Sequence, residues 1–406
     1  MKCGLLGEKL GHSYSPQIHN QLASYSYTLY EKRPEDLGQF LRSGQFTGLN
    51  VTIPYKKAVI PFCDLLTERA RQLGAVNTII RQADGSLLGH NSDYFGFQSM
   101  VQRSGLNPTG KKCLVLGSGG ASNTVVSVLQ EMGAQAVVIS RSGKNNYQNL
   151  HLHADAYMIV NATPVGMYPN TGVSPIDLSH FPVLEGILDL IYNPAKTQLL
   201  LDAEKRGIVA MNGLWMLVAQ AKESSEMFSG KAIDDSKIDA VYRMLKAQME
   251  NIILIGMPGC GKSTVGKTLA RLTGRECADT DDLVVQMSGK SIPEIFAQDG
   301  EPRFRQLETQ AIAHLGKKSN LIICTGGGCV TQKRNYPLLH QNGTIYWLQR
   351  DLKLLDTDGR PLSQKANLLQ MYQQRKPMYE DFCDKIIDNN GPVAESAALI
   401  LKNLEE

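Results

Sequence analysis

KCLVLGSGGASNTVVSVLQEM at residues 112–132 and NIILIGMPGCGKSTVGKTLARL at residues 251–272 are the two stretches that indicate the fold class most clearly. In each, a short aliphatic run leads into a glycine-rich turn and then into a helix-length segment without proline. This order predicts a strand, an anion-binding loop and a helix, because the backbone N–H groups of a helix's first turn point towards an anion. The glycines are spaced differently in the two loops. We therefore expect two different nucleotide-type ligands rather than an internal duplication.

Length and composition set the broad class. The chain has 406 residues, 42% hydrophobic and 20% charged, with a formal net charge of +3. These values predict several globular domains and give no indication of a nucleic-acid partner. The eight cysteines form no CxxC pair, and no apolar run reaches membrane-spanning length. We expect reduced thiols, a cytoplasmic protein and no membrane partner, whereas the oligomeric state is left open.

The junction between the two halves is predicted to be a helix. KIDAVYRMLKAQME at residues 237–250 has helical periodicity and runs directly into the expected strand Ile252–Ile255. No Gly/Ser/Pro-rich linker separates the halves. The boundary near residue 250 thus depends on where the second strand–loop–helix begins.

The first glycine loop predicts a dinucleotide site. Gly117 allows a tight turn and Gly119 allows close approach of a pyrophosphate, although Ser122 stands where a third Gly or Ala is usual. A merely tight strand-to-helix turn is the alternative. The next expected strand leads into a basic, hydroxyl-rich loop without an acid, and its candidate residues are Ser140, Arg141, Ser142 and Lys144. Because an acid there would hold the ribose hydroxyl of NAD, this loop favours the 2′-phosphate of NADP.

Three polar segments precede that loop: GHSYSPQIHN at 11–20, GLNVTIPYKK at 48–57, and GAVNTI at 74–79 followed by GHNSDYFGF at 89–97. They offer hydroxyls, an amide and a Lys/Asp pair, which suit a small polyhydroxylated acid; the candidates are Ser13, Ser15, Thr52, Asn77, Lys56 and Asp93. Lys56 and Asp93 can exchange a proton with an alcohol. Alternatively, Asp93 is a helix cap and Lys56 a surface lysine.

The second glycine loop satisfies the P-loop pattern GxxxxGK[ST] at residues 256–263. Its backbone amides would surround phosphates, Lys262 would reach the β- and γ-phosphates, and Ser263 would contribute an oxygen to Mg²⁺. Downstream lie Asp279-Thr280-Asp281, Arg305, the TGGGC segment at 325–329, DGRPLS at 358–363 and QRKPMY at 374–379. Taken singly, the arginines could be solvated helix-end charges and the glycines a tight turn.

Residues 3–245 resemble shikimate dehydrogenase. The strings SxSPxIHN, NVTIPYK, GAVNT, NxDxxGF and GxGGA come in the family's order, followed by VNATPVGM, LDLIYNPAKTQLL and NGLWMLVAQA. The resemblance implies shikimate-binding positions at Ser13, Ser15, Thr52, Asn77, Asp93, Tyr192 and Gln220, with Lys56 and Asp93 catalytic. It implies NADP-binding positions at Gly117, Ser118, Gly119, Gly120, Ala121, Ser140, Arg141, Ser142, Lys144, Leu190 and Gly213.

This half departs from the family pattern at three places. Ser140-Arg141-Ser142 replaces Asn-Arg-Thr, Ser92 replaces a threonine before Asp93, and Trp215 replaces a glycine of GLGML. We hypothesise that the bulk of Trp215 narrows the nicotinamide end of the pocket.

Residues 251–390 resemble shikimate kinase. The resemblance implies that Asp281 orients the acceptor hydroxyl, with Lys262 the other catalytic residue, and that the acid is bound by Asp281, Arg305, Gly327 and Arg375. It implies ATP-binding positions at Gly259, Cys260, Gly261, Lys262, Ser263, Thr264 and the lid residue Arg360, with Mg²⁺ held by Ser263 and Asp279.

Together these resemblances predict an α/β chain with three domains. We expect a substrate-binding domain at 1–102 completed by helices near 213–250, a Rossmann NADP-binding domain at 103–236, and a P-loop kinase domain with a parallel sheet at 251–406. The expected function is reduction of 3-dehydroshikimate with NADPH, then phosphorylation of shikimate with ATP. Three alternatives stay open: a first half that prefers quinate or NAD, one half that is a regulatory or catalytically impaired binding module, and a second half that phosphorylates another hydroxy acid such as gluconate.

Overall fold

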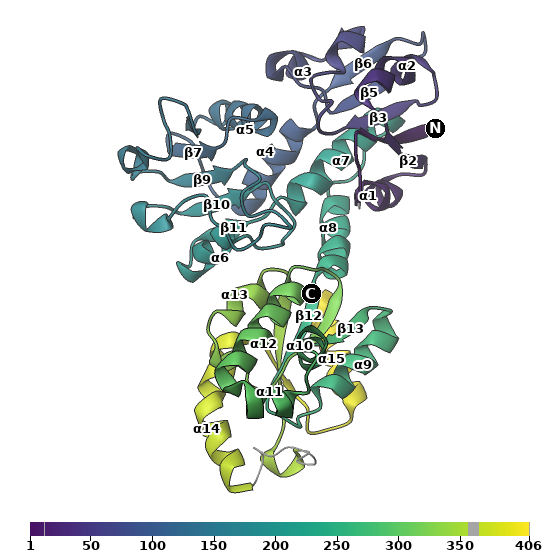
Figure 1. Ribbon diagram of the computed structural model, residues 1–406. Coiled ribbons are helices and arrows are strands. Elements are labelled where there is room, and N and C mark those ends of the chain that lie inside the picture. The colour runs from purple at the N-terminus through teal and green to yellow at the C-terminus, as the bar shows by residue number, and fades with distance from the viewer. Residues whose placement is uncertain (12, 356–364, 406) are drawn as a thin grey trace. The chain divides into compact units, whose positions relative to one another are not determined.

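The computed structural model describes residues 1–11, 13–355 and 365–405 (Figure 1). The chain divides into two compact units. The first comprises Met1–Pro164, Pro175–Tyr192 and Asp202–Tyr242, and the second comprises Val165–Ser174, Asn193–Leu201 and Arg243–Glu406. The predicted α/β class is confirmed, since the described residues form three sheets with helices between their strands. The exact domain boundaries stay a prediction.

The first sheet is mixed, in the order β2-β1-β3-β5-β6-β4. Its strands are β1 (Lys2–Gly7), β2 (Ser26–Glu31), β3 (Gly48–Val51), β4 (Leu65–Leu66), β5 (Thr78–Arg81) and β6 (Leu87–His90). Its helices are α1 (Ser15–Leu22), α2 (Leu37–Arg42) and α3 (Glu68–Leu73). Strands β1, β2 and β3 run parallel, and β5 is antiparallel to both β3 and β6. Leu6, Leu49 and Ile79 belong to the fully buried core of this part.

The second sheet is parallel, in the order β11-β10-β9-β7-β8. Its strands are β7 (Lys112–Leu116), β8 (Gln135–Ile139), β9 (Met158–Asn161), β10 (Gly186–Asp189) and β11 (Val209–Met211). The helices that follow or precede them are α4 (Asp93–Ser104), α5 (Gly120–Glu131), α6 (Gln198–Lys205) and α7 (Leu214–Ser229). Helix α7 packs along α4 and also contacts α1 and β5 of the first sheet (Figure 1). It therefore carries side chains to both parts of the first unit.

The third sheet is parallel, in the order β13-β14-β12-β15-β16. Its strands are β12 (Asn251–Ile255), β13 (Glu276–Asp279), β14 (Leu321–Cys324), β15 (Gly343–Gln349) and β16 (Lys385–Asp388). Its helices are α9 (Lys262–Thr273), α10 (Thr280–Ser288), α11 (Ile292–Gln298), α12 (Gly300–Gly316), α13 (Asn335–His340), α14 (Lys365–Phe382) and α15 (Val393–Glu405). Every residue of β12 is buried, as expected for a central parallel strand covered on both faces.

Several predicted elements are confirmed. The junction helix is α8 (Ser236–Met249), and it leads directly into β12. Both glycine loops lie between a buried strand and a helix, β7 and α5 in one case and β12 and α9 in the other. Both loops thus sit at the carboxyl end of a parallel strand, where α/β folds bind ligands.

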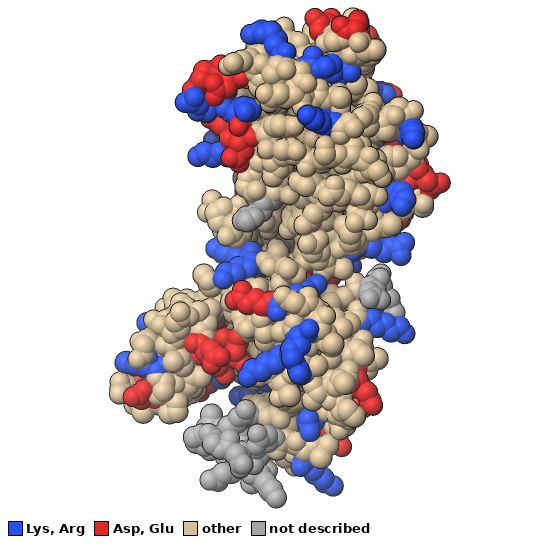
Figure 2. Space-filling model, turned by 90° about the vertical axis from the view of Figure 1, so that its right-hand side faces the viewer, with Lys and Arg blue, Asp and Glu red and all other residues tan. Residues whose placement is uncertain are grey.

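The surface carries mixed charge. On the face shown in Figure 2, Lys and Arg side chains alternate with Asp and Glu among larger uncharged areas. None of the helices in the described ranges combines the length and apolar composition that a bilayer-spanning segment needs. All eight cysteines are free thiols.

Candidate active sites

The first site centres on a lysine–aspartate pair. Lys56 lies in the turn after β3, and Asp93 is the first residue of α4. Lys56 Nζ donates to Asp93 Oδ2 at 2.6 Å, and the two side chains are 31% and 13% exposed. Asp93 does stand at a helix N-terminus, where the helix dipole favours a carboxylate, but Lys56 is not the solvated surface lysine of the alternative interpretation. The pair places an ammonium and a carboxylate where they can exchange a proton with a ligand.

Beside this pair lies a buried cluster of amides and a hydroxyl. The Asn77 side chain accepts the backbone N–H of Ser92 at 2.8 Å, and the Ser92 hydroxyl donates to Gln220 Oε1 at 3.2 Å. Asn77 and Ser92 are almost completely buried. Two predicted substrate positions, Asn77 before β5 and Gln220 on α7, are thereby brought together next to Asp93. The serine that replaces the family's threonine keeps the hydroxyl that this cluster uses.

The same network continues through residues that the sequence interpretation did not select. Tyr27 donates its hydroxyl to Asn50 Oδ1 at 2.7 Å, and Thr78 Oγ1 donates to Asn77 Oδ1 at 3.0 Å. The Asn50 amide in turn faces Thr78 at 3.5 Å. Burial raises the pKa of Tyr27 well above its ordinary value, so this phenol stays neutral. An asparagine inside the otherwise apolar strand β3 was the signal that could have revealed the network.

The remaining predicted substrate residues lie near the start of α1 and the end of β3. The Ser13 hydroxyl accepts the backbone N–H of Ser15 at 3.2 Å. The ring of Tyr192, which follows β10, meets that of Tyr14 edge-on, with centroids 6.4 Å apart, and Tyr14 is the residue between the two serines. Thr52 follows β3 directly, and its backbone N–H donates to the Leu6 carbonyl at 2.9 Å.

The glycine loop after β7 has the shape of an anion cradle. Gly117 has φ +101°, and a Cβ there would lie 2.9 Å from Thr163 Cγ2. A Cβ at Gly119 or Gly120 would meet nothing within 4 Å, so the chain leaves open space above the N-terminus of α5. Ser118 and Ala121 flank these glycines. The loop fits a pyrophosphate, which needs close backbone approach and free N–H groups.

The turn that is predicted to bind the 2′-phosphate of NADP is compact and basic. The backbone N–H of Ser140 donates to the Asn145 carbonyl at 3.2 Å, which folds residues 140–145 into a turn. Arg141, Ser142 and Lys144 are exposed on that turn. A Cβ on Gly213 would lie 2.2 Å from the Leu190 carbonyl oxygen, so these two predicted cofactor positions are in backbone contact.

The hypothesis that Trp215 narrows the nicotinamide pocket is wrong. Its side chain is 5% exposed, and its Nε1 donates to Ser99 Oγ at 2.9 Å. The Arg103 guanidinium lies 4.6 Å above the indole, and the Tyr242 ring meets it at 5.5 Å. Because α7 presents this residue to α4 and α8, the indole fills the core between helices instead of the ligand pocket.

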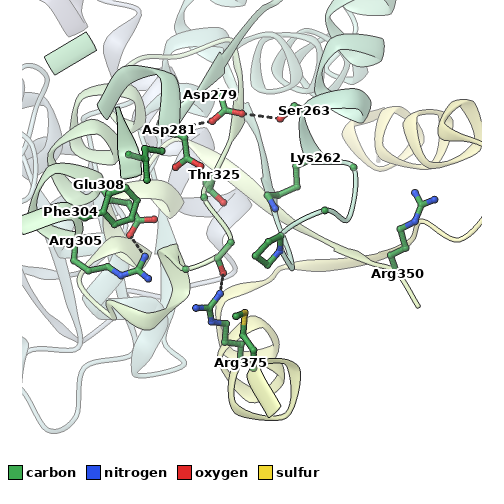
Figure 3. Close-up of a pocket in the computed structure, with 18 of the residues that line it drawn as sticks. Lys262, Ser263, Asp279, Asp281, Phe304, Arg305, Glu308, Thr325, Arg350 and Arg375 are labelled. Carbon is green, nitrogen blue, oxygen red and sulfur yellow. Dashed lines mark hydrogen bonds and ion pairs between the residues drawn. The ribbon is translucent and has the colours of Figure 1, made fainter. Parts of the chain in front are cut away.

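The second site is a cavity of about 600 Å³ around the P-loop (Figure 3). Gly256, Gly259 and Gly261 all have positive φ, which non-glycine residues rarely adopt. Lys262 Nζ donates to the Gly256 carbonyl at 2.9 Å and to the Met257 carbonyl at 3.0 Å. Cys260, itself a residue of the loop, is buried, and Thr264 lines the cavity. These two bonds hold the Lys262 ammonium inside the P-loop, where a bound phosphate would lie.

A hydroxyl and a carboxylate meet at the start of α9. Ser263 Oγ donates to Asp279 Oδ2 at 2.9 Å, and Asp279 caps α10 by accepting the backbone N–H of Asp281. Hard oxygen donors of this kind suit Mg²⁺, which usually takes one or two protein ligands and completes its shell with water and phosphate. The described residues contain no cluster of three or more metal-binding side chains.

Asp281 is an acid with an unusual environment. Burial and the neighbouring Asp279 raise its pKa to about 6, against a partial opposing effect of Lys262. Its Oδ1 is buried and has no hydrogen-bond partner among the described residues. A Cβ at Gly326 would lie 2.7 Å from this oxygen. The carboxylate therefore keeps an acceptor available to a ligand hydroxyl.

Glu308 binds Arg305, the arginine predicted to hold the substrate acid. Glu308 itself was not among the residues predicted from the sequence. Arg305 Nη1 donates to Glu308 Oε2 at 2.9 Å and Nη2 donates to Glu301 Oε1 at 3.0 Å. Glu308 is fully buried, and burial raises its pKa despite the arginine. The spacing of Arg305 and Glu308, three residues apart on α12, was a detectable signal.

The three glycines after β14 are required by close contacts. A Cβ at Gly327 would lie 2.6 Å from Pro258, and one at Gly328 would lie 2.3 Å from Arg305 Nη1. Arg375 on α14 donates to the Gly327 carbonyl at 3.1 Å, and Tyr379 donates to the same oxygen. Arg305, Gly327 and Arg375 thus surround one end of the cavity. Arg360 lies outside the described residues.

Fold and sites define a chain with two nucleotide-dependent catalytic parts: a Rossmann dehydrogenase and a P-loop small-molecule kinase. Comparison with known proteins gives the families. Residues 5–79 match the shikimate dehydrogenase substrate binding domain, and residues 258–405 match shikimate kinase. The NADP(+)-type shikimate dehydrogenase of Clostridium perfringens strain 13 is 33% identical over 267 residues, which cover 60% of this chain and 98% of that protein.

Solved structures agree. A chorismate mutase/shikimate 5-dehydrogenase fusion protein from Clostridium acetobutylicum is 36% identical with a TM-score of 0.57, covering 60% of this chain and 97% of that one. Shikimate 5-dehydrogenase from Thermus thermophilus, solved with NADP(H) and shikimate, is 29% identical with a TM-score of 0.56, covering 60% of this chain and 99% of that one. The chain belongs to the shikimate dehydrogenase family and carries a shikimate kinase domain in its C-terminal part.

Proposed function

We propose that the chain catalyses two consecutive reactions: NADPH-dependent reduction of 3-dehydroshikimate to shikimate, and MgATP-dependent phosphorylation of shikimate on its 3-hydroxyl. Shikimate and its ketone are the small-molecule partners. When bound, NADPH supplies the hydride and MgATP supplies the phosphoryl group. The chain's own residues bind, orient and move protons.

In the dehydrogenase site, Lys56 donates a proton to the oxygen of the reduced ketone, and Asp93 orients both Lys56 and the substrate. Asn77 and Gln220 hold hydroxyls of the ring, while Ser13, Ser15, Thr52 and Tyr192 bind the other end of the acid. The glycine loop at 117–121 binds the pyrophosphate, and the turn at 140–144 binds the 2′-phosphate. Leu190 and Gly213 line the nicotinamide end.

In the kinase site, Asp281 accepts the proton of the attacking hydroxyl. Arg305 and Arg375 bind the carboxylate of the acid, with the Gly327 backbone between them. Lys262 and the amides of residues 259–264 neutralise the charge on the phosphates, and Ser263 and Asp279 hold Mg²⁺. Arg360 stays a predicted nucleotide contact on the lid.

One observation carries the proposal: each phosphate-binding loop lies in the same unit as a set of groups suited to a polyhydroxylated acid. Lys56–Asp93 with the Asn77 cluster accompanies the first loop, and Asp281 with Arg305 and Arg375 accompanies the second. Neither set would serve an apolar or a cationic substrate.

The test supplies 3-dehydroshikimate, NADPH and MgATP to the purified chain and follows NADPH absorbance together with ADP formation. We expect ADP to appear only after NADPH oxidation begins, because the first reaction makes the second substrate. Initial rates with shikimate and quinate, each with NADP⁺ and NAD⁺, separate the quinate or NAD alternative. ADP formation with a panel of hydroxy acids that includes gluconate shows whether the second half prefers another phosphoryl acceptor. If one of the two activities is absent, the corresponding half is an impaired or regulatory module.

A further inference from the structure

An arginine that no part of the proposed mechanism uses faces the P-loop. Arg350 follows β15 at the carboxyl end of the third sheet and lines the same cavity as Lys262. Its Nη1 lies 3.7 Å from the position that a Cβ on Gly261 would take. The guanidinium therefore lies directly beside the loop whose amides would bind phosphate.

The Arg350 side chain has an unsatisfied donor. Its Nε is buried without a hydrogen-bond partner among the described residues, a state that ordinarily carries a free-energy cost. The two acid-binding arginines of the cavity are engaged, Arg305 by Glu308 and Arg375 by the Gly327 carbonyl. A cation left with an unsatisfied donor beside a phosphate-binding loop points to an anionic ligand.

The position of Arg350 indicates which part of the ligand it meets. In Figure 3, Asp281, Arg305 and Arg375 lie on one side of Lys262, and Arg350 lies on the opposite side. In the proposed mechanism the acceptor acid occupies the side of the two arginines, so the transferred phosphoryl group must point towards it. The nucleoside end of the nucleotide then extends to the side of Arg350.

A neighbouring asparagine fixes the loop at this point. Asn389 Nδ2 donates to the Cys260 carbonyl at 2.6 Å, and the same nitrogen lies 3.1 Å from the Cβ position of Gly261. Asn389 is fully buried and directly follows β16. Because this residue holds the loop beside Arg350, the guanidinium lies next to the backbone of Gly261.

We propose that Arg350 is a nucleotide-binding residue, which contacts the phosphate of the nucleotide nearest the nucleoside through its guanidinium. This assignment deepens the proposed kinase function and rests on it. The planar fork of arginine suits bidentate contact with phosphate oxygens, which a lysine cannot reproduce.

The experiment measures binding of Mg·ADP and of inorganic tripolyphosphate by calorimetry for wild type, R350Q and R350K. Loss of a charge-assisted hydrogen bond corresponds to roughly tenfold weaker binding or more. We expect R350Q to weaken both ligands by about that factor, with R350K intermediate and KM for shikimate unchanged. R271Q is the matched control, because Arg271 is exposed on α9 and bonds Thr268. For each variant, unchanged dehydrogenase activity and an unchanged thermal unfolding temperature show that the chain is folded.

Two results would overturn the assignment: unchanged ADP affinity in R350Q, or weakened ADP binding with unchanged tripolyphosphate binding, which would indicate a contact with the base. Failure of the kinase proposal is separable. A wild-type chain that binds ADP through Arg350 without phosphorylating shikimate would refute the proposed substrate and leave the nucleotide contact intact.

Discussion

Asp279 accepts the backbone N–H of Asp281 at 2.9 Å, which places two carboxylates within one turn at the start of α10. Their proximity, together with burial, gives the two carboxylates different environments. Asp279 also accepts from Ser263 and stays available to a cation, whereas the pKa of Asp281 is raised to about 6. In the proposed mechanism, one short segment thus provides both the metal ligand and the proton acceptor.

The first prediction concerns the pH dependence of phosphorylation. Asp281 must be ionised to accept the hydroxyl proton, so kcat for phosphorylation should rise as pH increases through about 6. D281N should lower kcat by a factor of roughly 10²–10⁴ and remove this rise. The dehydrogenase rate of the same variant, measured in the same buffers, is the control. A wild-type profile flat between pH values of about 5 and 7 would contradict the role of Asp281.

Asp281 also affects stability. A carboxyl whose folded pKa is raised stabilises the folded state below its ordinary pKa near 3.8, and this stabilisation is lost as pH rises through about 6. D281N should therefore increase the free energy of unfolding of the kinase part at a pH of about 8, by about 3 kcal/mol, and by much less at a pH of about 4. Urea titrations at the two pH values measure the difference.

Another prediction separates the two active sites. K56A should lower dehydrogenase kcat by about 10²–10⁴-fold and leave ADP formation from added shikimate unchanged. K262A should abolish phosphorylation and leave NADPH oxidation unchanged. Lys57, the exposed neighbour, offers the control K57A. Wild-type turnover in either active-site variant would remove that lysine from the mechanism.

Glu308 should be a positioning residue for the acid. E308Q removes the buried charge that holds Arg305, so KM for shikimate should rise about tenfold while KM for ATP stays constant. E301Q removes the charge of the other partner of Arg305. The Glu301 side chain is 61% exposed, so this variant should have little effect. Equal shikimate KM values in the two variants would show that burial of the Glu308 contact is unimportant.

Trp215 should matter for stability and not for the cofactor. W215F loses the hydrogen bond to Ser99 and should destabilise the first unit by about 1 kcal/mol, while W215G should cost about 4 kcal/mol or more. KM for NADPH in W215F should equal that of wild type. S99A tests the hydrogen bond alone, and a lowered NADPH KM in W215F would restore the pocket hypothesis.

Cofactor preference should depend on the turn after β8. R141A removes an exposed cation, so KM for NADPH should rise about tenfold and KM for NADH should not change. R71A, at an exposed arginine that pairs with Glu68, is the matched control. Parallel increases for both cofactors would place Arg141 away from the 2′-phosphate.

The sequence was sufficient wherever backbone geometry and local spacing carry the information. Glycines at fixed intervals after an aliphatic run identified both loops, since few other residues adopt the positive φ of Gly117 or Gly261. The helix at 236–249 and the strand after it followed from side-chain periodicity. The families and the fold class could be predicted from the sequence for the same reason, because the motifs that define them are short and contiguous.

The tertiary structure was needed wherever residues distant in the chain share one environment. Nothing in the spacing of Tyr27, Asn50 and Thr78 shows that they extend the Asn77 cluster, because neighbouring strands bring them together. The direction of a side chain is likewise set by packing, which placed the Trp215 indole between helices and the Arg350 guanidinium beside the P-loop. Sequence specifies which chemical groups exist; burial and the meeting of separate elements decide what each group faces.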